Sequence, residues 1–182
     1  MRRVAYRLAY RDSRWLHNRT ETIMLFLLLN VGTDRYVLAV SQVVTVIPAV
    51  VWTSVPDTPR GVAGLFNYHS TAVPLVDLSE LLCGTPSDVR MSTRIVVVDL
   101  ADVIGESRTQ GTTLLGVLVE SVMGTVRLEE SAFVDASAMT FGAPYLGPLL
   151  ANDEGIIRRL TIEQLLPCDV RDRMLRQCNS TT

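Results

Sequence analysis

From residue 23 onward the chain is a succession of short apolar runs rich in β-branched residues, each followed by turn-forming residues. Runs of this kind favour strands, and turn signals at such close spacing leave no room for long helices. The sequences at 32–35 and 151–153 predict two hairpins. We therefore expect an all-β protein with minor helices. Strands are predicted at 25–31, 36–40, 43–48, 72–76, 94–100, 113–120, 122–128, 145–150 and 154–160.

The segment 56–78 combines signals for turns, a strand and a helix start. Its prolines and glycines hold the backbone extended or allow sharp bends and close approach, and Asn67 can turn the chain. Pro74 cannot donate to a ladder, so we expect it at an edge or a bulge of the strand 72–76. Asp77 is placed to cap a short helix at 78–82. The segment contains no catalytic arrangement, and we interpret it as a docking surface.

The same segment resembles the signature of CheW-like domains, scaffold proteins that couple chemoreceptors to a histidine kinase in bacterial chemosensory arrays. The family pattern is roughly Pro, a few residues, Gly-Leu-x-Asn-x-Arg-Gly, then Val-Pro-Val-Val-Asp-Leu, and it aligns without a gap. The matching residues are Pro59, Gly64, Leu65, Asn67, Val73, Pro74, Val76, Asp77 and Leu78. Two positions depart from the pattern, because His69-Ser70 replaces Arg-Gly. Further along the chain, Val119-Glu120 stands where the family usually has Val-Asp.

The resemblance implies a fold of two small five-stranded, SH3-like barrels that share a hydrophobic core. It covers about 24–166, with one subdomain at about 24–83 plus a C-terminal helix and the other at about 93–145. A short helix is predicted at 161–166 and another at 169–177, within a C-terminal helix and tail at 167–182. The segments 66–68 and 144–147 resemble divergent adaptors of Wsp-type surface-sensing systems.

The resemblance also implies two partners, the regulatory domain of a CheA-type histidine kinase and the cytoplasmic tip of a methyl-accepting receptor. The expected location is the cytoplasm, at membrane-associated receptor arrays and without direct membrane insertion. In the family, a groove receives the helical tip of the receptor. The positions of this chain that fall near it are Val43, Thr45, Val46, His69, Val119, Glu120 and Val122. Ordinary core packing is the alternative for Val43, Val46 and Val122, and a surface loop without special role is the alternative for His69.

The composition argues against several classes of function. The chain has no lysine, which excludes Schiff-base chemistry and a Walker-type phosphate loop. A net charge of −2 argues against a general nucleic-acid binder. Cys83, Cys168 and Cys178 have no metal-site spacing, and the only histidines are His17 and His69. We expect no metal, no cofactor and a reducing compartment.

No pattern in the sequence indicates an enzyme. Catalysis needs a nucleophile beside a base, paired carboxylates in a cleft or an open metal site. The adjacent Glu129 and Glu130 follow a predicted strand and are interpreted as a solvated turn. The acidic residues at 99–106 are interpreted in the same way, as a polar loop. We therefore expect a binding protein.

The first 22 residues differ from the rest, because they contain six arginines and only two acidic residues. The apolar run that follows is too short to span a bilayer, and no signal-peptide cleavage site follows it. Residues 1–23 are therefore expected to be a basic extension, either flexible or the product of a start codon placed too far upstream. Tyr6, Tyr10 and Trp15 lie among the arginines, so the alternative function is a small β-barrel that binds nucleic acid or another polyanion.

Overall fold

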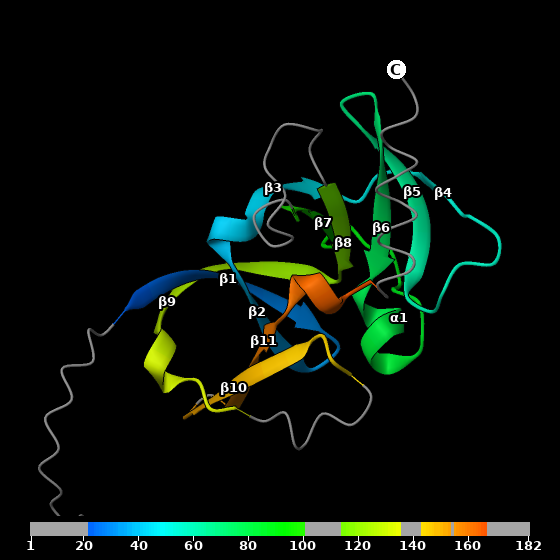
Figure 1. The fold of residues 1–182 in the computed structure, drawn as a ribbon. Helices are drawn as coiled ribbons and strands as arrows, with labels where there is room; N and C mark the ends of the chain where they lie inside the picture. The colour runs from blue at the N-terminus through cyan, green and yellow to red at the C-terminus, as the bar shows by residue number, and fades with distance from the viewer. Residues whose placement is uncertain (1–21, 101–113, 136–142, 154, 167–182) are drawn as a thin grey trace, which may run out of the picture.

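The structure, a computed structural model, describes residues 22–100, 114–135, 143–153 and 155–166. Within these ranges it is all-β with minor helices, as predicted, and its strands form two sheets (Figure 1). Sheet A has the order β10-β11-β2-β1-β9, and sheet B has the order β3-β7-β8-β6-β5-β4. The strands of sheet A are β1 (Ile23–Val31), β2 (Asp34–Ala39), β9 (Ser121–Glu129), β10 (Leu146–Asn152) and β11 (Gly155–Leu160). The strands of sheet B are β3 (Val43–Pro48), β4 (Trp52–Thr53), β5 (Val62–Tyr68), β6 (Thr71–Asp77), β7 (Arg94–Asp99) and β8 (Leu114–Val119).

The helical elements in the described ranges are short. One α-helix, α1 (Leu78–Cys83), follows β6, and three 3-10 turns are η1 (Val40–Gln42), η2 (Glu130–Ala132) and η4 (Ile162–Gln164). The helix predicted at 161–166 is therefore only a 3-10 turn, and Thr161 makes no side-chain cap there. The predicted helix at 169–177 and the polar loop at 101–111 lie outside the described residues.

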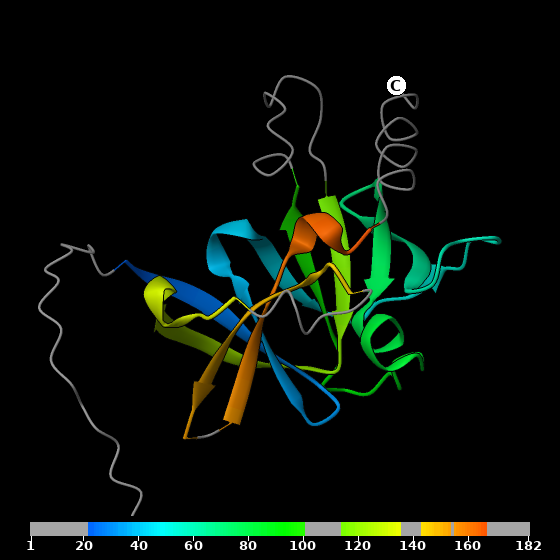
Figure 2. The ribbon, with the colours of Figure 1, turned by 60° about the horizontal axis from the view of Figure 1, so that its bottom comes forward.

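The two sheets do not divide the chain into its first and second halves. Strands β3 to β8 form sheet B, whereas sheet A combines β1 and β2 with β9 to β11 from the other end of the described chain. The chain passes between sheets at η1 and again between β8 and β9 (Figure 2). This differs from the strand assignment expected from the sequence, which put β1 to β6 in one subdomain and β7 to β9 in the other. The boundaries of the subdomains stay a prediction.

The largest hydrophobic cluster lies between the sheets. It includes Leu29 and Tyr36 from sheet A and Val96 and Val117 from sheet B, all at most 6% exposed. Successive side chains of a strand point to opposite faces, so neighbours such as Ile95 belong to a second cluster on the other face of sheet B. Both faces of the central strands are therefore buried, which explains their continuous apolar runs.

A third cluster lies on the other face of sheet A. Phe26 is fully buried in it, next to Val37 and Ile157. The ring centroids of Phe26 and Phe133 are 5.4 Å apart, and the Arg159 guanidinium lies 5.6 Å from the Phe26 centroid. Sheet A thus buries apolar side chains on both of its faces.

Strand β5 was not expected, because Gly64 and Asn67 indicate turns when the sequence is considered alone. Gly64 instead lies next to a register shift in the β5–β6 ladder and has a φ of +144°. A Cβ atom at Gly64 would meet the carbonyl oxygen of Thr53, the neighbouring residue of β4. Gly64 therefore allows β4 and β5 to approach closely and does not form a turn.

Pro74 also lies elsewhere than expected. It is buried in β6, which runs between β5 and β8 and is not an edge strand. The parallel pairing of β6 with β8 begins only at Leu75, opposite Gly116. Pro74 is tolerated because it precedes that ladder and pairs with Leu65 of β5.

Among the described residues, no helix is long and apolar enough to cross a membrane. In the same ranges, no group of three histidine, cysteine, aspartate or glutamate side chains lies close enough together to hold a metal ion.

Candidate functional site

The tip of the β5–β6 hairpin carries Asn67 and the two positions that depart from the family signature, and it projects beyond the neighbouring strands (Figure 1). His69 and Ser70 are its two turn residues, with φ values of +49° and +66°. Positive φ at both positions defines a type I′ turn, which suits the twist of the two strands. Asn67 supports the turn, because its Oδ1 accepts a hydrogen bond of 2.9 Å from the Ser70 amide. The His69 side chain is exposed and packs edge-on against Tyr68, with ring centroids 4.4 Å apart.

Asp77 caps α1, as predicted. Its Oδ1 accepts hydrogen bonds from the amides of Ser79 (2.9 Å) and Glu80 (3.3 Å). Both carboxylate oxygens also bind Ser87, whose amide and hydroxyl donate over 2.7 and 2.6 Å. Asp77 is 3% exposed and fully engaged in these contacts. Its role is to hold α1 and the segment after it, so we assign it to the scaffold.

Two other signature residues support the same region. Pro59 is half-buried, and its carbonyl oxygen accepts a hydrogen bond of 3.1 Å from the Val62 amide at the start of β5. Leu65 lies in β5 between Thr53 of β4 and Pro74 of β6. The signature thus shapes the β4–β5–β6 part of sheet B.

The valines expected at the groove pack on the core between the sheets. Val43, Val46 and Val122 are partly buried against this largest cluster, and Val119 is fully buried within it. Thr45 is half-buried in β3, an edge strand of sheet B. For Val43, Val46 and Val122, the structure is consistent both with core packing and with a contact to a partner. The Val119 side chain is buried and is not exposed to a partner.

The seven groove candidates do not gather at one point. Val43 lies opposite Val98 at one end of sheet B, and Val98 lies opposite Leu115. Val119 lies opposite Arg94 at the other end of the same ladder. The turn that carries His69 lies beyond the part of β6 that pairs with β8. Val43 and Val119, which were expected on opposite sides of the groove, thus lie at opposite ends of the β3–β7–β8 ladder, and the assignment of the groove residues stays a prediction.

Two exposed apolar residues beside these candidates were missed by the sequence analysis. Val44 falls at a register shift in the β3–β7 ladder and is 49% exposed. Met123 falls at a register shift in the β9–β1 ladder and is 62% exposed. A β-bulge redirects the side chain of its extra residue, which explains why both point outward next to buried valines. Gly124, with a φ of +133°, was the one available signal for the bulge in β9.

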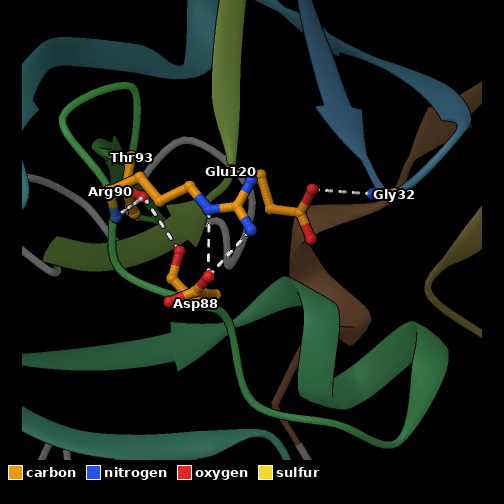
Figure 3. Close-up of polar contacts among 5 residues, drawn as sticks. All are labelled: Gly32, Asp88, Arg90, Thr93 and Glu120. Carbon is orange, nitrogen blue, oxygen red and sulfur yellow. Dashed lines mark hydrogen bonds and ion pairs between the residues drawn. The ribbon is translucent and has the colours of Figure 1, made fainter.

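Glu120 lies where the chain passes from sheet B to sheet A (Figure 3). Its Oε2 accepts a hydrogen bond of 2.9 Å from the amide of Gly32, in the β1–β2 turn. Nearby, the Arg90 guanidinium contacts Asp88 over 2.8 and 2.9 Å, and Thr93 Oγ1 accepts from the Arg90 amide over 2.8 Å. A shallow polar depression of about 190 Å³ lies here, lined by Asn30, Gly32, Asp88, Arg90, Ser92, Glu120 and Ser121.

Two tyrosines have raised pKa values, and both lie near α1 and not at the groove candidates. Burial, together with the negative charge of Asp34, raises the pKa of Tyr36 to about 12. Burial also raises the pKa of Tyr145, and Arg60 partly opposes this effect. These shifts reflect packing, since each tyrosine hydroxyl is withdrawn from water.

Comparison with known proteins agrees with this geometry. The profile of the CheW-like domain family matches residues 25–168. The fold is similar to the crystal structure of the scaffolding protein TtCheW from Thermoanaerobacter tengcongensis, with a TM-score of 0.68 and 17% sequence identity. That match covers 84% of this chain and 94% of the other. Because the family profile spans most of the sequence and the strands that it covers form the expected all-β fold, the chain belongs to the CheW-like domain family.

Proposed function

We propose that the protein is a non-enzymatic adaptor of a bacterial chemosensory pathway, which couples methyl-accepting receptors to a CheA-type histidine kinase. The observation that carries this proposal is the family match over residues 25–168. The adaptor works in the cytoplasm, at receptor arrays that it reaches through its partners. The Wsp-type subgroup stays a prediction.

The receptor surface in this proposal has two parts, the start of β3 and the start of β9. Val43 and Val122 pack on the core between the sheets, so this packing holds the backbone on either side of the exposed residues in place. Val44 and Met123 present apolar side chains to solvent beside them. An amphipathic helix binds to surfaces of this kind through apolar anchors. The helical tip of a receptor is a partner of that chemistry.

The kinase surface in this proposal is the loop between β3 and β4. Val51 is 93% exposed and Val50 is 38% exposed, although both are apolar. The loop leads into β4, a two-residue strand at the edge of sheet B. Exposed apolar side chains beside an open strand edge are a common basis for protein binding. The kinase surface is then a loop that lies apart from the start of β3 and the start of β9, so both partners bind at once.

The first test is a calorimetric titration of the full chain with the regulatory domain of the co-encoded histidine kinase, at physiological salt. We expect saturable binding with a Kd of about 1 to 10 μM, because several interfaces act together in an array and each can be modest. A second titration uses the cytoplasmic tip of the co-encoded receptor. Absence of heat at about 100 μM of either partner would contradict the adaptor function.

The alternative, binding of nucleic acid or another polyanion, depends on the basic segment 1–23, most of which lies outside the described residues. Retention of the full chain on a heparin column at low salt would revive it, since phosphate-type contacts weaken steeply as salt rises. Elution in the void volume would exclude it.

A further inference from the structure

The turn between β1 and β2 leaves one backbone donor without a partner inside the hairpin. Val31 pairs with Asp34, so Gly32 and Thr33 are the two turn residues. Gly32 has a φ of +58°, whereas Thr33 is not among the residues with positive φ, which fits a type II′ turn with glycine first. In a two-residue turn the flanking residues bond to each other, and the amide of the first turn residue points outward. A backbone amide in this position needs another acceptor.

Glu120 supplies that acceptor from a distant part of the chain. Its Oε2 lies 2.9 Å from the Gly32 nitrogen, and the two residues are 88 positions apart (Figure 3). Glu120 stands between β8 of sheet B and β9 of sheet A, and the next residue, Ser121, already pairs with Asn30 of β1. The hydrogen bond therefore joins the crossover between the sheets to the turn of sheet A. Glu120 lies directly before β9, which begins at Ser121, one residue before Val122.

The length of the side chain matters for this contact. An aspartate at this position would be shorter, because glutamate has one more methylene group, which adds about 1.5 Å of reach. We propose that Glu120 is a positioning residue, whose carboxylate fixes the start of β9 through Gly32 and does not serve as a charged contact for the receptor. The effect on receptor binding rests on the proposed function, whereas the hydrogen bond itself does not.

Three substitutions separate the two roles. Glu120→Gln keeps the length and an acceptor oxygen but removes the charge, whereas Glu120→Asp keeps the charge and shortens the side chain. Glu120→Ala removes both. If Glu120 acts by position, we expect Glu120→Gln to behave like the wild type and Glu120→Asp to behave like Glu120→Ala. A charged contact with the receptor predicts the opposite order, with Glu120→Asp active and Glu120→Gln impaired.

The direct readout is amide hydrogen exchange at Gly32 in the full-length protein, followed by NMR. We expect protection to fall about fivefold in Glu120→Asp and Glu120→Ala and by less than about twofold in Glu120→Gln, because one net hydrogen bond corresponds to such a factor. Receptor-tip affinity should follow the same order. Glu129→Asp, an equal shortening at the exposed far end of β9, is the control and should change neither quantity.

Equal protection of Gly32 in the wild type and Glu120→Ala would overturn the proposal, because the hydrogen bond would then not hold the turn. Loss of receptor binding in Glu120→Gln with unchanged Gly32 protection would also overturn it, in favour of a charged contact. If the wild type binds neither receptor nor kinase, the proposed function fails, while the order of protection at Gly32 still decides whether Glu120 holds the turn. A thermal melt of each variant checks that it is folded.

Discussion

Tyr145 donates a hydrogen bond from its hydroxyl to the carbonyl oxygen of Leu81, over 3.0 Å. The contact joins the segment before β10 to the second half of α1, so it links sheet A to the helix that follows β6 of sheet B. Carbonyl groups in the last turn of a helix have no partner within the helix, and a side-chain donor can satisfy one of them. We expect Tyr145→Phe to lower the free energy of unfolding by about 1 kcal/mol, measured by urea denaturation.

The matched control is Tyr68→Phe, which removes the hydroxyl of another half-buried tyrosine. No hydrogen bond to the Tyr68 hydroxyl is present among the described residues, so this variant should unfold at nearly the wild-type urea concentration. Equal losses in the two variants would mean that the Leu81 contact adds no specific stability.

Gly64→Ala should destabilise the protein far more than Gly124→Ala. Both glycines have a φ that side chains rarely adopt, +144° and +133°. A Cβ atom at Gly64 would meet the Thr53 carbonyl oxygen, whereas nothing lies within 4 Å of one at Gly124. We expect a loss of about 3 kcal/mol or more for Gly64→Ala and about 1 kcal/mol for Gly124→Ala, from denaturant melts. Similar losses of stability in the two variants would show that backbone strain, and not the contact with Thr53, causes the destabilisation.

Stability should fall at alkaline pH because of Tyr36. The folded-state pKa of Tyr36 is about 12, above the ordinary value of 10.0, because burial favours the neutral hydroxyl. The stabilisation is therefore complete below pH 10 and is lost as the pH rises toward 12. The chain has no lysine, so fewer groups titrate in this window than in most proteins. Urea melts from pH 9 to pH 12 should show a decline that Tyr36→Phe makes shallower; an equal slope in both proteins would contradict this assignment.

Val44→Asp should weaken receptor binding without changing kinase binding. Val44 is 49% exposed and lies beside Val43, so an aspartate there places a charge on the apolar receptor surface while leaving the core intact. We expect the Kd for the receptor tip to rise about tenfold in calorimetric titrations. Val89→Asp, at a valine that is 51% exposed, is the control. Parallel losses in both variants would indicate a general charge effect.

His69→Arg should strengthen receptor binding if the hairpin tip contacts the receptor. The side chain is exposed at a turn, so the longer arginine can be accommodated. A guanidinium forms two parallel hydrogen bonds with a carboxylate, and we expect an affinity gain of about fivefold. His69→Lys restores charge without the planar fork and should gain less. An unchanged Kd in His69→Arg would remove this position from the receptor surface.

Much of the secondary structure could be predicted from the sequence because it depends on local patterns. The run at 43–48 became β3 with the predicted ends, and Asp77 caps the helix that its position indicated. Strand β5 was missed because a glycine such as Gly64 is typical both of a turn and of a close approach between strands. Only the structure, in which β4 lies beside β5, shows that Gly64 allows a close approach.

The pairing of the strands could not be predicted, since it depends on contacts between distant segments. Nothing in the periodicity of 122–128 indicates that this strand pairs with β1 and leaves sheet B. For the same reason the groove candidates could be named but not located relative to one another. Val44 and Met123 were missed because a bulge changes the direction of a single residue within a strand, and only Gly124 signalled the bulge in β9.

The arrangement of the sheets has a consequence for synthesis on the ribosome. Every strand of sheet B comes from one continuous stretch, so its partners emerge from the ribosome one after another. Strands β1 and β2 emerge first, but their other neighbours in sheet A, β9 and β11, are made only near the end of the domain. Closing a long loop is slow compared with pairing neighbouring segments. In the nascent chain, the apolar strand β1 therefore lacks its partner β9, and β2 lacks its partner β11, until synthesis of the domain is nearly complete. These first strands are the part of the molecule most exposed to misfolding during synthesis.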